Sequence, residues 1–242
     1  MGLITTPLRL ALRRLGLDVD RHCRSYASRR QRILHRLGVS LVIDVGANVG
    51  QYAVELRKEG FRGRILSVEP VADSYARLAK RCKSDWRWDC LNVALGRDEG
   101  VCEIHVSENR VSSSVLNMRV LHVEAAPSSQ YRFSETVPMC RLDDLVTQDQ
   151  LAAEIIAVKL DVQGYEGQVL AGGQRVLAVA AAVETEVSLV ELYEGQANLQ
   201  EMLDYMCGQG FRPVGMQPGF VHPSTDETLQ LNVLFARSTH AE

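Results

Sequence analysis

Residues 41–50, which read LVIDVGANVG, have the pattern of a strand that enters a glycine turn and then a helix. Residues 41–45 are apolar except for Asp44, which is typical of a strand buried on both faces. Gly46 and Gly50 allow a sharp turn and a close approach of the backbone to a ligand. Open α/β sheets bind ligands at the carboxyl ends of their strands, where this turn lies. The stretch therefore predicts an α/β sheet with a cofactor site at its first strand.

Strands and helices alternate beyond this turn, which predicts a doubly wound, Rossmann-like and mostly parallel sheet. A short connection between the last two strands predicts an antiparallel edge, and the serine-rich residues 107–131 are expected to form an irregular loop. The predicted strands are 41–45, 64–68, 88–94, 101–106, 155–160, 180–187, 211–216 and 229–236, and the main predicted helices are 51–59, 72–82, 167–177 and 199–209.

The overall composition is that of a folded domain of ordinary size. The 242 residues are 46% hydrophobic and 24% charged, and the net charge of −3 argues against a nucleic-acid partner. No apolar run approaches the roughly 18 residues of a membrane-spanning helix. The six cysteines fall in no CxxC or zinc-finger spacing, and arginines interrupt every apolar stretch near the N-terminus. We therefore expect unpaired thiols and a cytoplasmic location.

Residues 1–36 are predicted to form a basic helical segment, separate from a domain that spans residues 37–242. Nine arginines against Asp18 and Asp20 give this segment a charge of +7 and leave −10 for the rest. The apolar residues that recur at helical spacing are Ile4, Leu8, Leu12 and Leu15. Two interpretations stay open: the apolar stripe packs on the domain, or the helix contacts anionic lipid at the inner membrane face or an acidic substrate.

The residues around the glycine turn predict an adenosine cofactor with a cationic end. The turn has the spacing GxxxG, whereas the NAD fingerprint requires GxGxxG. Asp44 lies two residues before Gly46, where a carboxylate would repel a pyrophosphate and hold the ammonium of a methionine moiety. Glu69 ends the second predicted strand, 25 positions after Asp44, which suits an acid that binds both ribose hydroxyls.

Asn92 and Ala94 end the third predicted strand at the same edge of the sheet and are expected to line the adenine. The full set predicted to contact the cofactor is Asp44, Gly46, Ala47, Asn48, Gly50, Tyr52, Glu69, Pro70, Asn92, Ala94 and Asp161.

Carboxylates follow the next two predicted strands. Asp161 is expected to orient an acceptor hydroxyl, take its proton or help to hold a divalent metal. Glu184 and Glu186 share one face of the following strand, because strand residues alternate faces. Glu186 and His105 are further candidates for the catalytic base, with His122 as another. No histidine joins the carboxylates in sequence, so a metal is not favoured.

A run of serines lies in the irregular loop. Ser112, Ser113 and Ser114 offer hydroxyl groups that suit a polyhydroxylated acceptor, and we predict that they bind the substrate. A flexible polar loop without a binding role is the alternative.

These motifs together resemble the FkbM-type S-adenosylmethionine-dependent methyltransferases, over residues 38–237 and in the same order. The resemblance is carried by VIDVGANVGQY, SVEP, NVALG, the serine run, RLDDL and KLDVQGYEGQVLAGG. It implies the class I methyltransferase fold, with a seven-stranded sheet of order 3-2-1-4-5-7-6, and S-adenosylmethionine as cofactor. It also implies O-methylation of hydroxyl groups on sugars or natural products. The cofactor contacts that it implies are at Asp44, Gly46, Asn48, Gly50, Glu69 and near Asn92, and it gives Asp161 an active-site role.

One residue departs from this resemblance. Gln163 occupies a position where the family more often has glutamate, which removes a charge beside Asp161 and weakens the case for a metal.

Three functions remain open on the sequence. The first is O-methylation of a sugar hydroxyl on a glycolipid or other glycosylated metabolite, and the second is O-methylation of a soluble polyketide-type product. The third is a non-catalytic module that binds S-adenosylmethionine, against which the acid–glycine turn, Glu69 and Asp161 all argue. A nucleic-acid methyltransferase is disfavoured because the domain is acidic and no NPPY-like motif follows the fourth strand.

Overall fold

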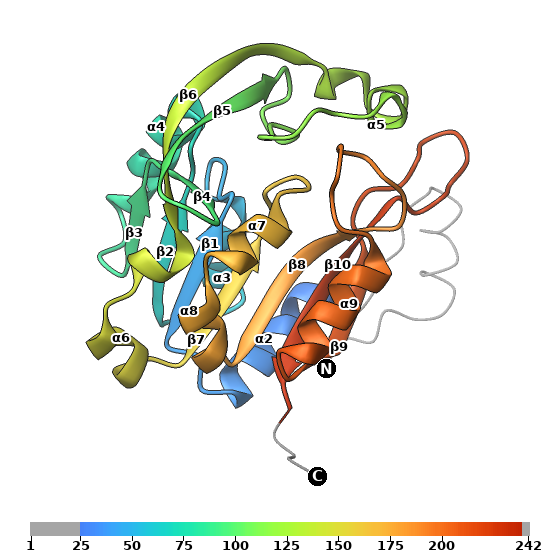
Figure 1. Ribbon diagram of the computed structural model, residues 1–242. Coiled ribbons are helices and arrows are strands. Elements are labelled where there is room, and N and C mark those ends of the chain that lie inside the picture. Colours follow the sequence, from blue (N-terminus) through green and yellow to red (C-terminus); the bar gives the residue numbers. More distant parts are fainter. Residues whose placement is uncertain (1–24, 239–242) are drawn as a thin grey trace, which may run out of the picture.

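The computed structural model describes residues 25–238, which are built around a seven-stranded sheet with helices on both faces (Figure 1). The strand order is β3-β2-β1-β7-β8-β10-β9, which is 3-2-1-4-5-7-6 when only the strands of this sheet are numbered. The bounds are β1 Leu41–Val45, β2 Arg64–Val68, β3 Trp88–Leu91, β7 Ile156–Leu160, β8 Ala182–Ser188, β9 Phe211–Pro218 and β10 Gln230–Arg237. The predicted Rossmann-like class is confirmed.

The last two strands form an antiparallel pair at one edge of this sheet, as predicted, and β10, which runs opposite to the other strands, lies one place inside that edge. β10 pairs in antiparallel fashion with both β8 and β9, whereas the pairs from β3 to β8 are parallel. The reason is the path of the chain: helix α9 (Leu199–Gly208) carries it from β8 to the edge, where β9 forms. The chain then turns back, and β10 fills the place between β8 and β9.

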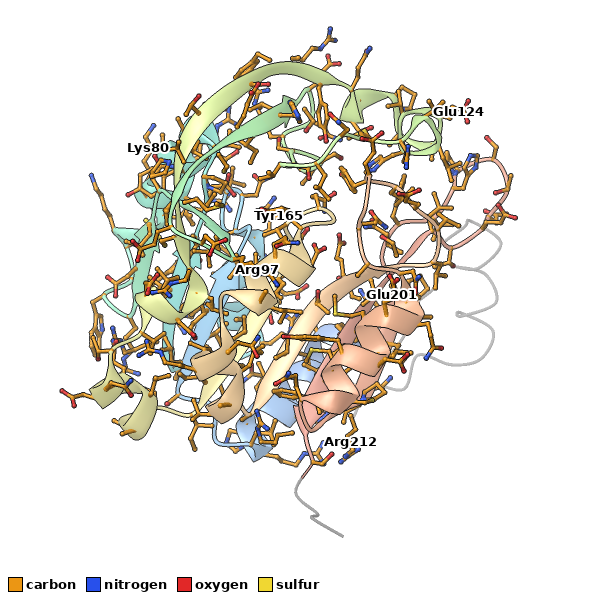
Figure 2. All side chains as sticks on the ribbon, viewed as in Figure 1. Lys80, Arg97, Glu124, Tyr165, Glu201 and Arg212 are labelled. Atoms are coloured by element: carbon orange, nitrogen blue, oxygen red, sulfur yellow. The ribbon has the colours of Figure 1, made fainter. Side chains whose placement is uncertain are left out.

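Two apolar layers hold the helices against the sheet, and side chains fill the space between them (Figure 2). Leu170, Leu177 and Met206 pack on one face, and Leu56 and Leu78 pack on the other, all nearly free of solvent. Burying each such side chain stabilises the fold by about 1.5–3 kcal/mol. The helices of the first face are α7 Glu166–Ala171, α8 Gln174–Val179 and α9, and those of the second are α2 Tyr26–Arg36, α3 Gln51–Lys58 and α4 Ala72–Cys82.

Helix α2 lies within the predicted N-terminal segment, residues 1–36, and its apolar side packs in the core of the domain. Leu34 is 1% exposed and belongs to the same apolar cluster as Val42 and Leu234 of the sheet. Ser25 caps the helix by accepting a hydrogen bond from the backbone of Ser28. The rest of the predicted amphipathic helix, with Ile4, Leu8, Leu12 and Leu15, lies outside the described residues.

A second sheet, of order β4-β6-β5, forms an arm that extends beyond one end of the main sheet (Figure 1). Ala94 was expected to end the third strand but begins β4, because β3 stops at Leu91. Residues 107–131 were expected to be irregular but contain two short helices. The bounds are β4 Ala94–Gly96, β5 Gly100–Ser107, α5 Val120–Ala125, η2 Pro127–Ser129 and β6 Tyr131–Arg141, and η3 Leu142–Leu145 and α6 Gln148–Ala153 then lead to β7.

None of the helices in residues 25–238 combines the length and the apolar character that a membrane crossing requires. Five cysteines fall in this part of the chain, and no disulfide joins them: Cys82, Cys90, Cys102, Cys140 and Cys207.

Candidate functional site

A cavity of about 540 Å³ opens at the carboxyl ends of β1, β2, β7 and β8. It brings together residues that lie far apart in the sequence, from α2 near the N-terminus to β10 near the C-terminus. The sequence-predicted residues that line it are Asp44, Gly46, Ala47, Asn48, Tyr52, Glu69, Pro70, Ala94, Ser113, Ser114, Asp161 and Glu186. Five others do not line it: Gly50, Asn92, His105, Ser112 and His122.

Gly50 and Asn92 support the fold around the cavity. Gly50 has a positive φ of 86°, and a Cβ atom there would lie 2.7 Å from the Trp88 ring, so packing against the indole requires glycine. The side-chain amide of Asn92 donates hydrogen bonds to the carbonyl oxygens of Glu69 and Pro70, each at 2.9 Å. It fixes the turn after β2, and the adenine contact predicted for it stays a prediction.

His105 and Ser112 lie in the arm, outside the cavity lining. The Nδ1 atom of His105 is 3.0 Å from the Ser134 hydroxyl, and its ring stacks on Tyr131 with centroids 5.0 Å apart. The Ser112 hydroxyl accepts a hydrogen bond from the side-chain amide of Asn109 at 3.2 Å. The structure therefore does not place His105 beside Asp161 and Glu186 as a third catalytic group.

The turns after β1 and β7 contact each other at Gly46, and this contact requires a glycine there. A Cβ atom on Gly46 would lie 1.8 Å from the carbonyl oxygen of Asp161, and the residue has a φ of 76°. The Asp161 amide donates a hydrogen bond to the Val45 carbonyl at 3.0 Å. Because only glycine fits this contact, the cofactor turn and Asp161 lie side by side.

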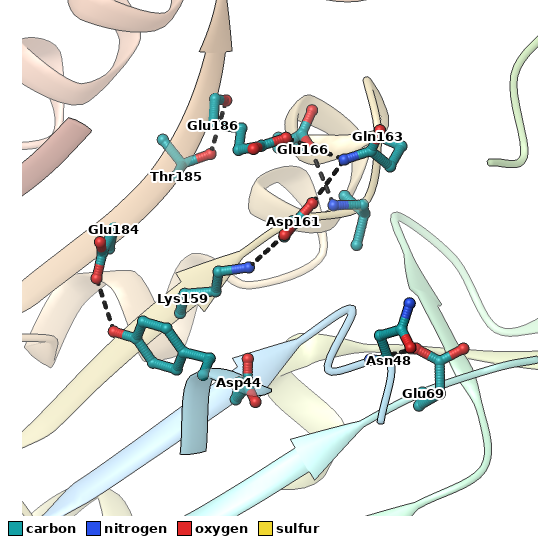
Figure 3. Close-up of polar contacts among 12 residues, drawn as sticks. Asp44, Asn48, Glu69, Lys159, Asp161, Gln163, Glu166, Glu184, Thr185 and Glu186 are labelled. Atoms are coloured by element: carbon teal, nitrogen blue, oxygen red, sulfur yellow. Dashed lines mark hydrogen bonds and ion pairs between the residues drawn. The ribbon is translucent and has the colours of Figure 1, made fainter. Parts of the chain in front are cut away.

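Glu69 directly follows β2 in the cavity wall, and two backbone amides hold its carboxylate; Figure 3 shows it beside Asn48. One oxygen accepts a hydrogen bond from the Asn48 amide at 2.7 Å, and the other accepts one from the Val71 amide at 2.9 Å. Glu69 is 5% exposed, and this burial raises its pKa to about 7 despite the two hydrogen bonds. Each oxygen keeps a further lone pair for a ligand hydroxyl.

Asp44 is fully buried at the end of β1 and is only partly satisfied. Its Oδ2 atom accepts a hydrogen bond from the Ser67 hydroxyl at 3.1 Å, whereas Oδ1 has no hydrogen-bond partner within residues 25–238. Burial raises the pKa of Asp44 to about 6, and the charge of Lys159 opposes this rise. An orphaned carboxylate oxygen in the cavity wall fits the cationic end of S-adenosylmethionine.

Asp161 and Glu186 are joined by one neutral amide (Figure 3). The Nε2 atom of Gln163 donates to Asp161 Oδ1 at 2.7 Å and to Glu186 Oε2 at 2.9 Å. Its Oε1 atom accepts a hydrogen bond from the Tyr193 hydroxyl at 2.7 Å. Lys159 completes the cluster with an ion pair to Asp161 Oδ2 at 2.8 Å. Gln163 is therefore fully satisfied and holds the two carboxylates on one edge of the cavity.

The charges of this cluster are unevenly balanced. Burial alone would lower the pKa of Lys159, but the charges of Asp161 and Asp44 outweigh it and raise the pKa to about 12. Burial, followed by the charge of Asp161, raises the pKa of Glu186 well above its ordinary value. In the part of the chain that the structure describes, no three His, Cys, Asp or Glu side chains converge as metal ligands. The surroundings of Glu186 thus stabilise its neutral form, which is the form that it takes on accepting a proton.

Helix α2 supplies a buried wall to the cavity through Arg30, which is 3% exposed. Its guanidinium lies 4.4 Å from the centroid of the Tyr52 ring and forms ion pairs with Glu55 and Glu184. The Tyr52 hydroxyl donates to Glu184 at 2.7 Å (Figure 3). The arginine-rich N-terminal segment thus contributes a residue to the site itself.

Lys159, Arg30 and two amides of the last strands line the cavity but were not predicted as site residues. Lys159 could have been found, because it lies two residues before Asp161 and strand residues alternate faces. Arg30 carries no sequence signal that separates it from the other arginines of its segment. Gln217 and Asn232 could be placed only once the pairing of β9 with β10 was known.

Comparisons with known proteins agree with this geometry. A family model described as the methyltransferase FkbM domain matches residues 44–213. The 2-O-methyltransferase NoeI of Sinorhizobium fredii (strain NBRC 101917 / NGR234) is 29% identical over 191 residues, which cover 72% of this chain and 76% of that protein. The crystal structure of methyltransferase FkbM from Methylobacillus flagellatus KT is similar in fold, with a TM-score of 0.51 and 14% identity. That likeness covers 82% of this chain but 43% of the solved one, so this chain spans less than half the length of that structure.

Proposed function

We propose that this chain, which belongs to the FkbM methyltransferase family and is an S-adenosylmethionine-dependent methyltransferase, methylates a hydroxyl group of a sugar. The relative NoeI is named a 2-O-methyltransferase, which supports oxygen as the acceptor atom. The side-chain amides of Gln217 and Asn232 in the cavity lining can hydrogen-bond ring hydroxyls, and this favours a sugar over a polyketide-type product. The proposed acceptor is a glycolipid or another glycosylated metabolite.

The observation that carries the proposal is the carboxylate pair Asp161 and Glu186, held by Gln163 in the same cavity as Glu69. When bound, S-adenosylmethionine supplies a methyl group on a sulfonium, which is already a good leaving group. Glu69 would hold the ribose hydroxyls, and Asp44 would face the cationic end. The remaining tasks of the protein are to position the acceptor and to remove its hydroxyl proton.

Glu186 is the better proton acceptor of the pair. Both oxygens of Asp161 are engaged, one by Lys159 and one by Gln163. Glu186 uses only Oε2, and its Oε1 has no hydrogen bond to another residue of 25–238. A carboxylate with a raised pKa is also the stronger base near neutral pH. We therefore assign proton removal to Glu186 and orientation of the acceptor hydroxyl to Asp161.

Transfer of a labelled methyl group from S-adenosylmethionine tests this function directly. The acceptors are methyl glycosides and a bacterial glycolipid extract, and nuclear magnetic resonance identifies the atom that carries the label. We expect an O-methyl sugar, and Glu186→Gln should lower turnover by about 10²–10⁴-fold with cofactor affinity nearly unchanged. Glu103→Gln on the exposed side of β5 is the matched control. A label on nitrogen or carbon, or full activity in Glu186→Gln, would contradict the proposal.

A further inference from the structure

A row of polar side chains crosses β8, β10 and β9 on the wall of the cavity. Glu186 pairs directly with Asn232, and Asn232 pairs directly with Gln217. Directly opposed residues on neighbouring strands project from the same face of a sheet. All three residues line the cavity, on the side of β7 that lies away from β1 and β2. The row therefore includes the proposed base, Glu186, and is separated from the cofactor turn by β7.

The two amides of this row have hydrogen-bonding groups to spare. Asn232 and Gln217 are both half-buried, and their side chains form no hydrogen bond with any residue between 25 and 238. Each amide offers two donors and one acceptor. The Gln163 amide, by contrast, has all its groups engaged by other side chains. Both amides face the cavity with their donors and acceptors free, so they are available to a ligand that enters it.

The serine run, which was predicted to bind the acceptor, has fewer free hydrogen-bonding groups than the two amides. The Ser114 hydroxyl donates to the Gln163 carbonyl at 2.7 Å and accepts from the Leu116 amide at 3.0 Å. The Ser113 hydroxyl donates to the Arg110 carbonyl at 3.2 Å. Both hydroxyls thus stabilise the loop, which leaves the amide row as the stronger candidate for contacts with an acceptor.

The charges around the row select against an anionic acceptor. Arg30 forms ion pairs with Glu184 and Glu55, and Lys159 forms an ion pair with Asp161. Glu186 has no ion-pair partner of its own within residues 25–238. Glu186 must be ionised to take the hydroxyl proton, and in that form a phosphate or carboxylate on the acceptor would meet its uncompensated negative charge in a partly buried site.

We propose that Glu186, Asn232 and Gln217 form an acceptor subsite for an uncharged sugar ring, with Arg30 and Tyr52 in its supporting wall. This inference rests on the proposed function, and it adds where the acceptor binds and that the acceptor is uncharged. The two amides hold neighbouring ring hydroxyls, and the hydroxyl next to Glu186 receives the methyl group. Asn232 and Gln217 are positioning residues in this arrangement.

Saturation-transfer nuclear magnetic resonance on the full chain with bound S-adenosylhomocysteine tests the subsite. The probes are the methyl glycosides of glucose, galactose, mannose and fucose, together with methyl glucuronide. We expect at least one neutral glycoside to bind and the glucuronide to bind at least tenfold more weakly. Asn232→Leu and Gln217→Met should each weaken the neutral glycoside by about five- to tenfold, the effect of one lost hydrogen bond.

Two controls separate the possible results. Calorimetry with S-adenosylhomocysteine should give the same affinity in both variants, which shows that they are folded, and Gln200→Met on the exposed surface of α9 should change nothing.

If neutral glycosides bind to both variants as well as to the wild type, the subsite is wrong while the proposed function stands. If none of the four binds, or if the glucuronide binds best, the charge class is wrong. If sugars are methylated but these variants keep the wild-type KM, the amide row has no role.

Discussion

Glu69 links the fold and the cofactor at the level of a single residue. Its carboxylate ties the glycine turn to the start of α4, because it accepts hydrogen bonds from the backbone of Asn48 and of Val71. The same group faces the cavity, where the ribose hydroxyls of the cofactor are expected. A single change should therefore affect both stability and cofactor binding.

Glu69→Ala should weaken binding of S-adenosylmethionine by roughly 1–3 kcal/mol, because it strands polar groups of the ligand and of the protein. The melting temperature of the free protein should also fall, since two buried amides lose their acceptor. Isothermal calorimetry and thermal unfolding measure the two effects. Asn92→Ala is a useful comparison, because Asn92 supports the same turn from outside the cavity. Unchanged cofactor affinity in Glu69→Ala would remove this residue from the binding site.

Glu166 makes the stability of the protein depend on pH. Burial raises its pKa from 4.5 to about 7, although its carboxylate accepts hydrogen bonds from the Val162 and Gly164 amides. The folded state therefore binds more protons than the unfolded state between these two pH values. The contribution of Glu166 to stability is present below pH 4.5 and is lost as the pH rises toward 7.

Glu166→Gln should abolish this loss, because glutamine retains the acceptor oxygen and cannot ionise. We expect the variant and the wild type to be similar at pH 4.5, and the variant to be more stable by ~3 kcal/mol at pH 8. Urea unfolding at both pH values provides the measurement, with Glu103→Gln as the control. Equal differences at the two pH values would show that Glu166 is not protonated in the folded state.

Helix α2 illustrates what an element contributes beyond its own sequence. Its apolar side, with Leu34, packs on the sheet, and its Arg30 reaches Glu184 of β8. Both charged side chains of that ion pair are about 95% buried. Removal of one partner from a buried ion pair costs roughly 3–5 kcal/mol, because the other charge stays behind without compensation.

A double-mutant cycle should detect this coupling between α2 and β8. We expect Arg30→Met to lower the free energy of unfolding by ~3 kcal/mol, and the further change Glu184→Gln to restore at least half of that loss. Urea unfolding of the two single variants and the double variant gives the coupling energy. If the two losses simply add, Arg30 and Glu184 do not stabilise each other.

Part of the site could be predicted from the order of strands and helices in the sequence. Asp44, Glu69 and Asp161 each end a strand, and the alternation of strands and helices fixes which edge of the sheet they share. These residues could therefore be predicted. Gly50 and Asn92 match the pattern but serve packing, because their roles depend on contacts with Trp88 and with the turn after β2.

The site residues that were not predicted are placed by contacts between segments that lie far apart in the sequence. Arg30 enters the cavity from a segment expected to lie outside the domain, since its position follows from how α2 packs on the sheet. Asn232 and Gln217 meet Glu186 only because β10 inserts between β8 and β9. No local periodicity reports such an insertion.

At the scale of the whole molecule, the arginine-rich N-terminus remains a candidate for contact with a membrane surface. Residues 1–24 hold five arginines, and each basic residue near an anionic bilayer is worth about 1 kcal/mol. We predict that the full chain floats with phosphatidylglycerol vesicles and that a chain lacking residues 1–24 does not. The truncation keeps α2, because this helix belongs to the core. Equal flotation of both chains, or equal binding to phosphatidylcholine, would contradict membrane contact.

Calorimetric titration of the full chain with S-adenosylmethionine measures whether the cavity beside Gly46 holds this cofactor. We expect saturable binding of one molecule per chain, with no comparable binding of NAD. Asp44→Asn should weaken this binding, whereas the matched variant Asp98→Asn on the exposed surface should not. An absence of binding heat with S-adenosylmethionine, tighter binding of NAD, or an unchanged affinity in Asp44→Asn would contradict binding of the cofactor in this cavity.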